Sequence, residues 1–479
     1  MIFMELTTRI VKNTTIFFIA QVMSYLLVFL YTIYIVRYLG PNNFGILTFG
    51  ISVISILGIF TDLGLNTLMT REIARDKSKN LEYFSNFITI KLVLISLIMV
   101  PTLVIIYMLN YSGNVFYVII VLMFSMVFTT FSGAFYSIFQ AYEKLEFQSA
   151  MIFFSSILML IGVLAVIHYE LNVVAFAFVY LLVGGITLIY CIFIAYRNFI
   201  LPNLKFDLDF WKNNIKFALR FGLVGIFATI YVWIDSSMLF FIHGSIATGF
   251  YGASYRIVLA LLFIPSAISA AVFPVLSRLH STSYDSVKEI IWRYFKYMLI
   301  VGVPMGLGGT LLAPQIIIFL YGDSYVNSIL VFQILICATA FTFANAAFVQ
   351  LFQSTNKELI VTKITGLWVI GNILLNLILI PKYSYIGASI STLITEFGVA
   401  TFLIIAYSKT RYVIEKRMVF LTLSKIIVAS MIMGIVIWIL KFVNLILLII
   451  IAIIFYLSIS YLIGAINQED IKIIKSIRK

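Results

Sequence analysis

Residues 14–36 read TTIFFIAQVMSYLLVFLYTIYIV, a run of 23 residues without a charged side chain. A helix of that length is about 34 Å long at 1.5 Å per residue, and the hydrocarbon core of a bilayer is about 30 Å thick. Similar apolar runs recur along the whole chain, separated by short polar segments. They predict a protein built from transmembrane helices.

The composition supports this prediction. Of the 479 residues, 63% are hydrophobic and 11% are charged, and the mean hydropathy is +1.11. Soluble domains carry about 25% charged residues, so the composition excludes an ordinary soluble enzyme. Irregular backbone cannot face lipid, and the alternating ten-residue strands of a membrane barrel are missing from the sequence. We therefore expect an all-α polytopic membrane protein.

The apolar runs divide into fourteen predicted transmembrane helices. No connecting loop exceeds about twenty residues, which is too short for a separate soluble domain. The predicted helices start near Thr14, Phe44, Phe84, Val115, Gln148, Asn172, Ile215, Ala247, Arg293, Val326, Glu358, Tyr385, Val419 and Phe442.

The basic residues predict the orientation in the membrane. Of the 32 Lys and Arg, all but Arg37, Arg256, Lys382 and Lys441 fall in alternate loops. Loops rich in Lys and Arg stay on the cytoplasmic side, so both termini are expected there, as an even number of helices requires. The net charge of +13 is then mostly topological. We expect a multi-pass protein of a prokaryotic cytoplasmic membrane that does not bind nucleic acid.

Two halves of the chain share a short motif. Residues 139–144 read FQAYEK and residues 352–357 read FQSTNK, at an offset of 213 residues. Six helices return the chain to the side that it left, so the offset predicts two six-helix lobes in parallel orientation, an architecture typical of transporters. We expect an N-terminal lobe over 1–200, a cytoplasmic linker over 201–214 and a C-terminal lobe over 215–408. Helices 13 and 14, with a basic tail, occupy 409–479.

Ionisable residues inside predicted spans are functional candidates, because each is costly to insert. Asp235 in helix 7 and Arg256 in helix 8 are predicted at similar depth. They form either a structural ion pair or an anion site in a central cavity, where the planar guanidinium of Arg256 binds phosphate oxygens bidentately. Asp62 and Glu396 are candidates for coupling to H⁺ or Na⁺.

Structural explanations compete with some of these roles. Asp62 also fits a local helix cap or a pair with Arg71. Lys91 and Lys363 are expected to extend their side chains to the inner membrane interface. The segment of helix 9 from Gly302 to Pro314, rich in Gly and Pro, fits either bending around a cavity or close packing against a neighbouring helix.

The sequence contains no signature of an enzyme. A GxxxxGK[ST] phosphate-binding loop is missing, and His168, His243 and His280 are far apart in the sequence, so we expect neither an ATP-driven protein nor a metal or organic cofactor. A membrane polymerase or transferase of glycans usually needs a large catalytic outer loop, which is not predicted here. The repeat and the buried charges likewise argue against a scaffold without transport activity.

Several stretches resemble one transporter family. Residues 37–45 read RYLGPNNFG, residues 62–66 read DLGLN and residues 70–75 read TREIAR. Later come WID at 233–235, YGASYR at 251–256, FPVLS at 273–277 and IPKY at 380–383. In this order they resemble the polysaccharide (Wzx-like, O-antigen repeat-unit) flippases of the multidrug/oligosaccharidyl-lipid/polysaccharide exporter superfamily.

The resemblance implies a fold like that of the multidrug exporters of this superfamily, with two additional helices. It implies alternating access and a polyprenyl-diphosphate-linked oligosaccharide as cargo, moved from the cytoplasmic to the outer leaflet. Membrane lipid is an expected partner, as are glycan polymerases and glycosyltransferases. In this interpretation the cavity site consists of Arg256, Arg37 and Asp235, in which Asp235 holds Arg256 until the phosphate competes for it. Lys144, Lys357 and Arg71 line the cytoplasmic entrance.

The main alternative is a cation-coupled exporter of drugs or metabolites from the same superfamily. In such a protein Asp62, Asp235 and Glu396 would bind the coupling ion. No nucleotide-binding motif supplies energy, so in either case direction comes from an ion gradient or from consumption of the cargo outside.

The predicted topology can be tested by labelling single cysteines. Cysteines at Ser112 and Asp323 should react with a membrane-impermeant reagent from outside, and cysteines at Ser78 and Ser286 should react only after the inner face is exposed. Labelling of position 286 from the outer face of intact cells would contradict the whole assignment.

Overall fold

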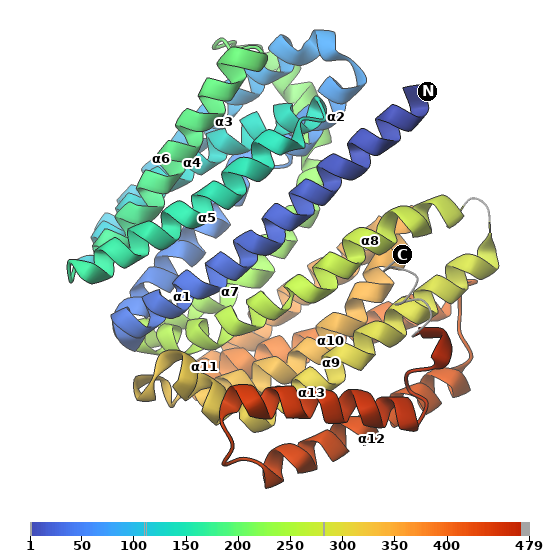
Figure 1. Ribbon diagram of the computed structural model, residues 1–479. Helices are drawn as coiled ribbons and strands as arrows, with labels where there is room; N and C mark the ends of the chain where they lie inside the picture. Colours follow the sequence, from blue (N-terminus) through green and yellow to red (C-terminus); the bar gives the residue numbers. More distant parts are fainter. Residues whose placement is uncertain (1, 110, 112, 281–282, 471–479) are drawn as a thin grey trace. The chain divides into compact units, whose positions relative to one another are not determined.

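The computed structural model describes residues 2–109, 111, 113–280 and 283–470, with residues 2–18 described by their backbone alone. The labelling position Ser112 and the basic tail residues Lys472, Lys475, Arg478 and Lys479 lie outside the described residues. Within that part of the chain the regular elements are α-helices and two short 3₁₀ turns, Lys77–Lys79 and Asp323–Tyr325, without any strand (Figure 1). The all-α prediction is confirmed.

The chain divides into two compact units, Met1–Gly252 and Ala253–Lys479. Unit 1 contains α1 (Ile2–Asp62), α2 (Leu65–Arg75), α3 (Asn80–Met108), α4 (Asn114–Ala141), α5 (Leu145–His168), α6 (Val173–Asn198) and most of α7 (Leu208–Leu261). Unit 2 contains the end of α7 and α8 (Phe263–His280), α9 (Tyr284–Tyr321), α10 (Ser328–Ser354), α11 (Glu358–Ser408), α12 (Lys416–Ile439) and α13 (Leu445–Leu462). The predicted lobe boundaries at 200 and 214 differ from this division and remain predictions.

Three long helical stretches are bent, and each is long enough for two membrane segments. Eleven helical stretches in the described chain are long and apolar enough to span a membrane. Three of them, Ile19–Arg75, Leu208–His280 and Glu358–Ser408, have 57, 73 and 51 residues, at least twice the roughly 20 that one crossing needs. Non-helical backbone at Gly40, Gly244 and Ser384 divides these three. The resulting fourteen segments agree with the predicted number.

The repeated FQxxxK motif forms the same helix ending in both units. Glu143 and Asn356 adopt left-handed backbone with φ of 58° and 57°. The backbone N–H of Lys144 donates to Phe139 O at 2.8 Å, and that of Lys357 donates to Phe352 O at 2.8 Å. This six-to-one hydrogen bond with a left-handed residue is the Schellman ending of a helix. The motif is therefore a structural repeat as well as a sequence repeat.

Two glycines in unit 1 allow bent helices to touch through their backbones. A Cβ on Gly45 of α1 would lie 1.8 Å from Ser245 O of α7. A Cβ on Gly249 would lie 1.9 Å from Pro41 O. Any larger residue at either position would push the corners of α1 and α7 apart. Elsewhere in unit 1, α1 packs against α5 and α4 packs against α6 (Figure 1).

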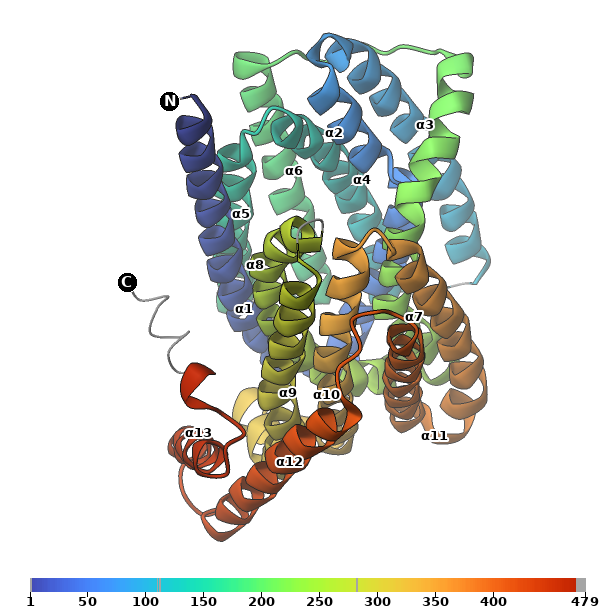
Figure 2. The same cartoon turned by 90° about the vertical axis from the view of Figure 1, so that its right-hand side faces the viewer.

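In unit 2 the glycines of α9 form a packing face. A Cβ on Gly302 would lie 2.9 Å from Phe343 Cβ of α10, and a Cβ on Gly309 would lie 2.6 Å from an Ile336 side-chain carbon. Although Pro304 and Pro314 lie inside it, α9 continues as one helix from Tyr284 to Tyr321. Of the two explanations for this segment, the structure supports close packing. The other side of α9 packs against α12, and α13 follows at the edge of the unit (Figure 2).

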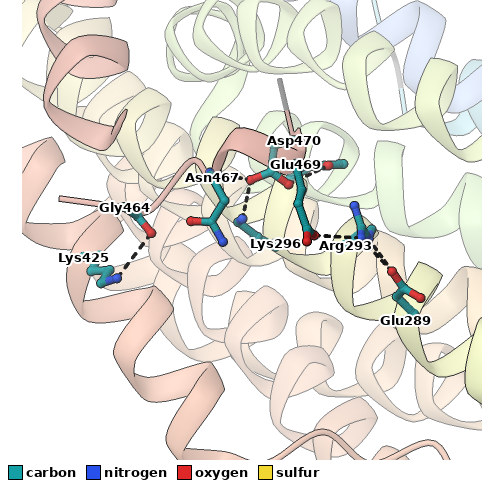
Figure 3. A network of polar contacts seen from close by, with 9 residues as sticks. Glu289, Arg293, Lys296, Lys425, Gly464, Asn467, Glu469 and Asp470 are labelled. Atoms are coloured by element: carbon teal, nitrogen blue, oxygen red, sulfur yellow. Dashed lines mark hydrogen bonds and ion pairs between the residues drawn. The ribbon is translucent and has the colours of Figure 1, made fainter. Parts of the chain in front are cut away.

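A buried ion pair attaches the segment after α13 to α9. Lys296 Nζ donates to Asp470 Oδ2 at 2.5 Å, and the Tyr297 hydroxyl donates to Asp470 Oδ1 at 2.9 Å (Figure 3). The backbone N–H of Asn467 adds a third hydrogen bond to this carboxylate at 2.7 Å. The side chains of Lys296 and Asp470 are 8% and 6% exposed. Arg293 forms a more exposed bridge from α9 to Glu469, at 3.3 Å.

The carboxylate of Asp470 is held in its charged form. Burial opposes ionisation, but the hydrogen bonds from Lys296, Asn467 and Tyr297 outweigh it and lower the pKa of Asp470 below its ordinary value of 3.8. A lowered pKa stabilises the fold above the ordinary value, and that stability is lost as the pH falls through the lowered pKa. The pair is therefore permanent at neutral pH.

We expect the Lys296→Met and Asp470→Asn substitutions each to lower the melting temperature of the purified protein in detergent. Removing one partner of a buried ion pair costs about 3–5 kcal/mol, because the other charge stays buried. The double variant Lys296→Met with Asp470→Met should recover most of the loss.

The matched control is Lys144→Met, which breaks the exposed pair with Glu146, where the side chains are 53% and 38% exposed. Such pairs contribute about 0–1 kcal/mol, so its melting temperature should hardly change. A double variant as unstable as the single ones would show that the buried pair is not what attaches this segment.

Candidate functional site

The candidate site in unit 1 begins at the break between α1 and α2. Helix α1 ends at Asp62, and the next two residues, Leu63 and Gly64, have positive φ of 49° and 86°. The Asp62 carboxylate accepts hydrogen bonds from the backbone N–H groups of Gly64 and Asn66, both at 3.2 Å. It thereby caps the start of α2, as one of the two structural explanations predicted. A Cβ at Gly64 would lie 2.3 Å from Ala218 O, so α7 passes directly over this turn.

The partner of Asp62 is a lysine from α3 and not Arg71. Lys91 Nζ lies 2.6 Å from Asp62 Oδ1, and the Lys91 side chain is completely buried. The expectation that Lys91 extends to the membrane interface is therefore wrong, because an internal carboxylate is closer than the interface. Arg71 lies instead 3.8 Å from Glu72 and is 42% exposed.

This ion pair lines a cavity of about 280 Å³ inside unit 1. The cavity lies among the second arm of α1, the start of α2, and α3 and α4. Most of its lining is polar, in a unit whose helices are otherwise strongly apolar. The lining residues are Ile54, Ser55, Gly58, Thr61, Asp62, Asn66, Lys91, Met126, Thr129 and Thr130.

Asp235 is buried within unit 1. Its carboxylate accepts a hydrogen bond from the Tyr251 hydroxyl at 2.6 Å, and its residue is 3% exposed. Two residues later, Ser237 forms a hydrogen bond with Ser52 of α1 at 2.8 Å. Asp235 is thus an intramembrane acid with a defined partner, which the sequence alone did not reveal.

Arg256 belongs to unit 2, so the predicted pairing with Asp235 remains a prediction. It is half-buried on the second arm of α7. Its charge acts on Tyr321 of α9, whose hydroxyl donates to Ala253 O at 3.1 Å. Arg37, the other predicted cation of the cargo site, is exposed at the end of the first arm of α1.

Glu396 lies in a second polar cluster, within unit 2. It is 8% exposed, and Asn345 Nδ2 of α10 donates to its Oε2 at 3.1 Å. Asn376 Nδ2 donates to Asn372 Oδ1 at 3.0 Å on the neighbouring arm of α11. The carboxylate of Glu396 can carry a proton, and the amide oxygens beside it are potential ligands for a hard cation. Among the described residues no group of three or more His, Cys, Asp or Glu could hold a metal ion.

The residues predicted at the cytoplasmic entrance lie at solvent-exposed corners. Lys144 and Lys357 are exposed directly after the two Schellman endings. Arg71 is exposed on α2, where its guanidinium also lies 5.5 Å from the centre of the Phe221 ring. All three can meet an anion from bulk water without desolvation.

Two buried ion pairs, Asp62–Lys91 and Lys296–Asp470, were not predicted from the sequence. A signal existed for the first, because Lys91 is a lone base inside an apolar run, and a buried base requires an acid nearby. The sequence offered Asp62 as that acid but also offered Arg71 as its competitor. The choice between them depended on how α3 is rotated.

The chain is similar to known proteins both in sequence and in fold. Residues 10–280 match the family described as "Polysaccharide biosynthesis protein". A relative from Haloferax volcanii named "Probable flippase AglR" is 27% identical over 39% of this chain and 37% of its own length. A second from that organism, named "Probable low-salt glycan biosynthesis flippase Agl15", is 22% identical over 87% of this chain and 88% of its own.

A solved structure shares the fold. "Lipid II flippase MurJ, inward closed conformation" superimposes with a TM-score of 0.76 at 16% sequence identity, over 93% of this chain and 98% of that one. At this identity the similarity establishes the architecture alone. The family match covers more than half of the sequence, and the chain therefore belongs to the polysaccharide biosynthesis protein family.

Proposed function

We propose that this protein is a flippase that moves a polyprenyl-diphosphate-linked oligosaccharide from the cytoplasmic to the outer leaflet by alternating access. The observation that carries the proposal is a polar, charge-lined cavity of about 280 Å³ within apolar helices of this family. A diphosphate and sugars cannot cross hydrocarbon unaided, whereas the prenyl tail is stable in lipid. The protein need only shelter the polar head group.

The two relatives named as flippases support this function, and the family supports a role in polysaccharide biosynthesis. In our proposal the exposed cations Lys144, Lys357 and Arg71 gather anionic head groups at the cytoplasmic face, where both termini lie. Arg256, with Arg37, then contacts the diphosphate. Glycosyltransferases supply the cargo inside, and a glycan polymerase consumes it outside.

Flipping can be measured in proteoliposomes with a fluorescent polyprenyl-diphosphate oligosaccharide, by its accessibility to a membrane-impermeant quencher. Transport of this lipid, and not of organic cations, is the expected result. Transport of organic cations without any lipid flipping would favour the exporter alternative.

Substitution of Arg256 tests the proposed contact with the diphosphate. We expect Arg256→Ala to slow flipping by roughly 10- to 100-fold, because charge-assisted hydrogen bonds contribute about 1.5–3 kcal/mol each. Arg256→Lys should retain part of the activity, since the charge remains but the planar fork is lost. The control is Arg197→Ala, at the exposed end of α6. Equal rates for Arg256→Ala and wild type, at equal protein content, would exclude the contact.

Substitution of Glu396 tests the coupling ion. We propose that Glu396 carries a proton during the cycle, with Asp62 as the corresponding acid of unit 1. Glu396→Gln should then flip at a rate that no longer responds to an imposed pH gradient. Glu358→Gln, on the exposed first turn of α11, should respond like wild type. A Glu396→Gln variant that keeps the full response would assign coupling elsewhere.

A further inference from the structure

The linker between α6 and α7 has one apolar face. Residues 199–207 form neither helix nor strand, and residues 203–208 read NLKFDL, a strict alternation of polar and apolar side chains. Successive side chains of an extended chain point to opposite faces, so Leu204 and Phe206 share a face, and Leu208 follows them at the start of α7. We call these three residues the linker stripe. They are 67%, 71% and 75% exposed.

The backbone of the linker is held on α3. Ser85 Oγ accepts a hydrogen bond from the N–H of Asn203 at 3.0 Å, and Thr89 Oγ1 accepts one from the N–H of Lys205 at 3.1 Å. Four residues of a helix rise about 6 Å, and two residues of extended chain span about 6.6 Å, so the two spacings match. Figure 2 shows the linker passing the start of α3 on its way from α6 to α7.

These contacts place the linker at the edge of the membrane. The predicted membrane segment of α3 starts near Phe84, and the buried Ser85 and Thr89 lie in its first two turns. A backbone N–H group in bulk water can bond to solvent, whereas one that enters the membrane needs a partner in the protein. Trp211 donates its indole N–H to Asn86 Oδ1 of the same turns at 3.1 Å, and Trp is enriched at membrane interfaces.

The surroundings of the stripe are basic. The linker and the first turns of α7 carry two acids, and one of them, Asp207, caps α7, because its Oδ1 accepts a hydrogen bond from the N–H of Phe210 at 3.0 Å. The same stretch carries three exposed lysines, Lys205, Lys212 and Lys216. Lysines beside a membrane surface are attracted to anionic lipids.

We propose that the linker stripe inserts into the inner leaflet at the level of the head groups, and that the three lysines bind anionic lipid head groups beside it. Large apolar side chains are stabilised by leaving water, and the hydrogen bonds to α3 keep them at the depth where lipid is their neighbour. The stripe then fixes the depth of the junction between α6 and α7. This inference goes beyond the proposed function, because it does not involve the cargo.

Spin labels test the insertion directly. Full-length protein in lipid nanodiscs, with Cys191 and Cys337 replaced by alanine, would carry a single label in the Leu204→Cys or the Leu208→Cys variant. Both labels should relax faster with oxygen, which concentrates in hydrocarbon, than with a water-soluble nickel chelate. The matched control is Asn203→Cys, one residue away on the opposite face of the linker, where the nickel chelate should be the more effective reagent.

Two results would overturn the insertion. If positions 204 and 208 favour the nickel chelate as position 203 does, the stripe faces water. If they are closed to both reagents, a protein surface covers the stripe instead of lipid. The labelled variants should melt in detergent at the temperature of the unlabelled protein, because the stripe side chains are mostly exposed.

Lipid composition tests the role of the lysines. The nanodiscs would contain phosphatidylcholine alone or a mixture with phosphatidylglycerol. In the mixture the accessibility of position 204 to the nickel chelate should fall about two- to fivefold, because anionic lipid attracts each lysine to the surface. Replacing Lys205, Lys212 and Lys216 together by glutamine should remove this difference. High salt should weaken it in the protein with its lysines, because salt screens exposed charges.

The matched control removes the same charge elsewhere. Lys409, Lys416 and Arg417 are exposed between α11 and α12 or at the start of α12, and their joint replacement by glutamine should leave the response to phosphatidylglycerol unchanged. The head-group contact is overturned if the triple linker variant responds like this control. It is also overturned if position 204 is equally accessible in both kinds of nanodisc when the lysines are present.

Discussion

The structure depends on one constraint, that every polar group inside the hydrocarbon must find its partner within the protein. Backbone groups meet it by forming helices long enough to cross, and the chain turns at Schellman endings or at single bent residues such as Gly40 and Gly244. Charged side chains meet it by pairing. Lys91 and Lys296 are both buried bases, and each pairs with an acid from another helix or segment, Asp62 and Asp470 respectively.

The same kind of pair has different consequences in the two places. The Asp470 carboxylate is saturated by three hydrogen bonds and ties the chain after α13 to α9, so the pair acts as a permanent attachment. The Lys91–Asp62 pair instead joins α3 to the break between α1 and α2, beside a cavity of about 280 Å³. We assign a structural role to the Lys296–Asp470 pair, because it holds a segment of the chain in place.

A flippase for a lipid-linked glycan must provide different environments for the different parts of its cargo. Its cargo has an apolar tail, a charged diphosphate and neutral sugars, and each part requires a different environment. In our proposal cations such as Arg256 bind the diphosphate.

The sequence by itself determined the elements that depend on local patterns. Apolar runs of about 20 residues predicted the membrane helices, because helix rise and bilayer thickness fix their length, and FQxxxK marked two identical helix endings. Only the tertiary structure decided which charges meet. Lys91 finds Asp62 29 residues away, and Lys296 finds Asp470 174 residues away. Such partners depend on how each helix is rotated and packed. When a helix is apolar on nearly every face, its sequence does not indicate which face points into the protein.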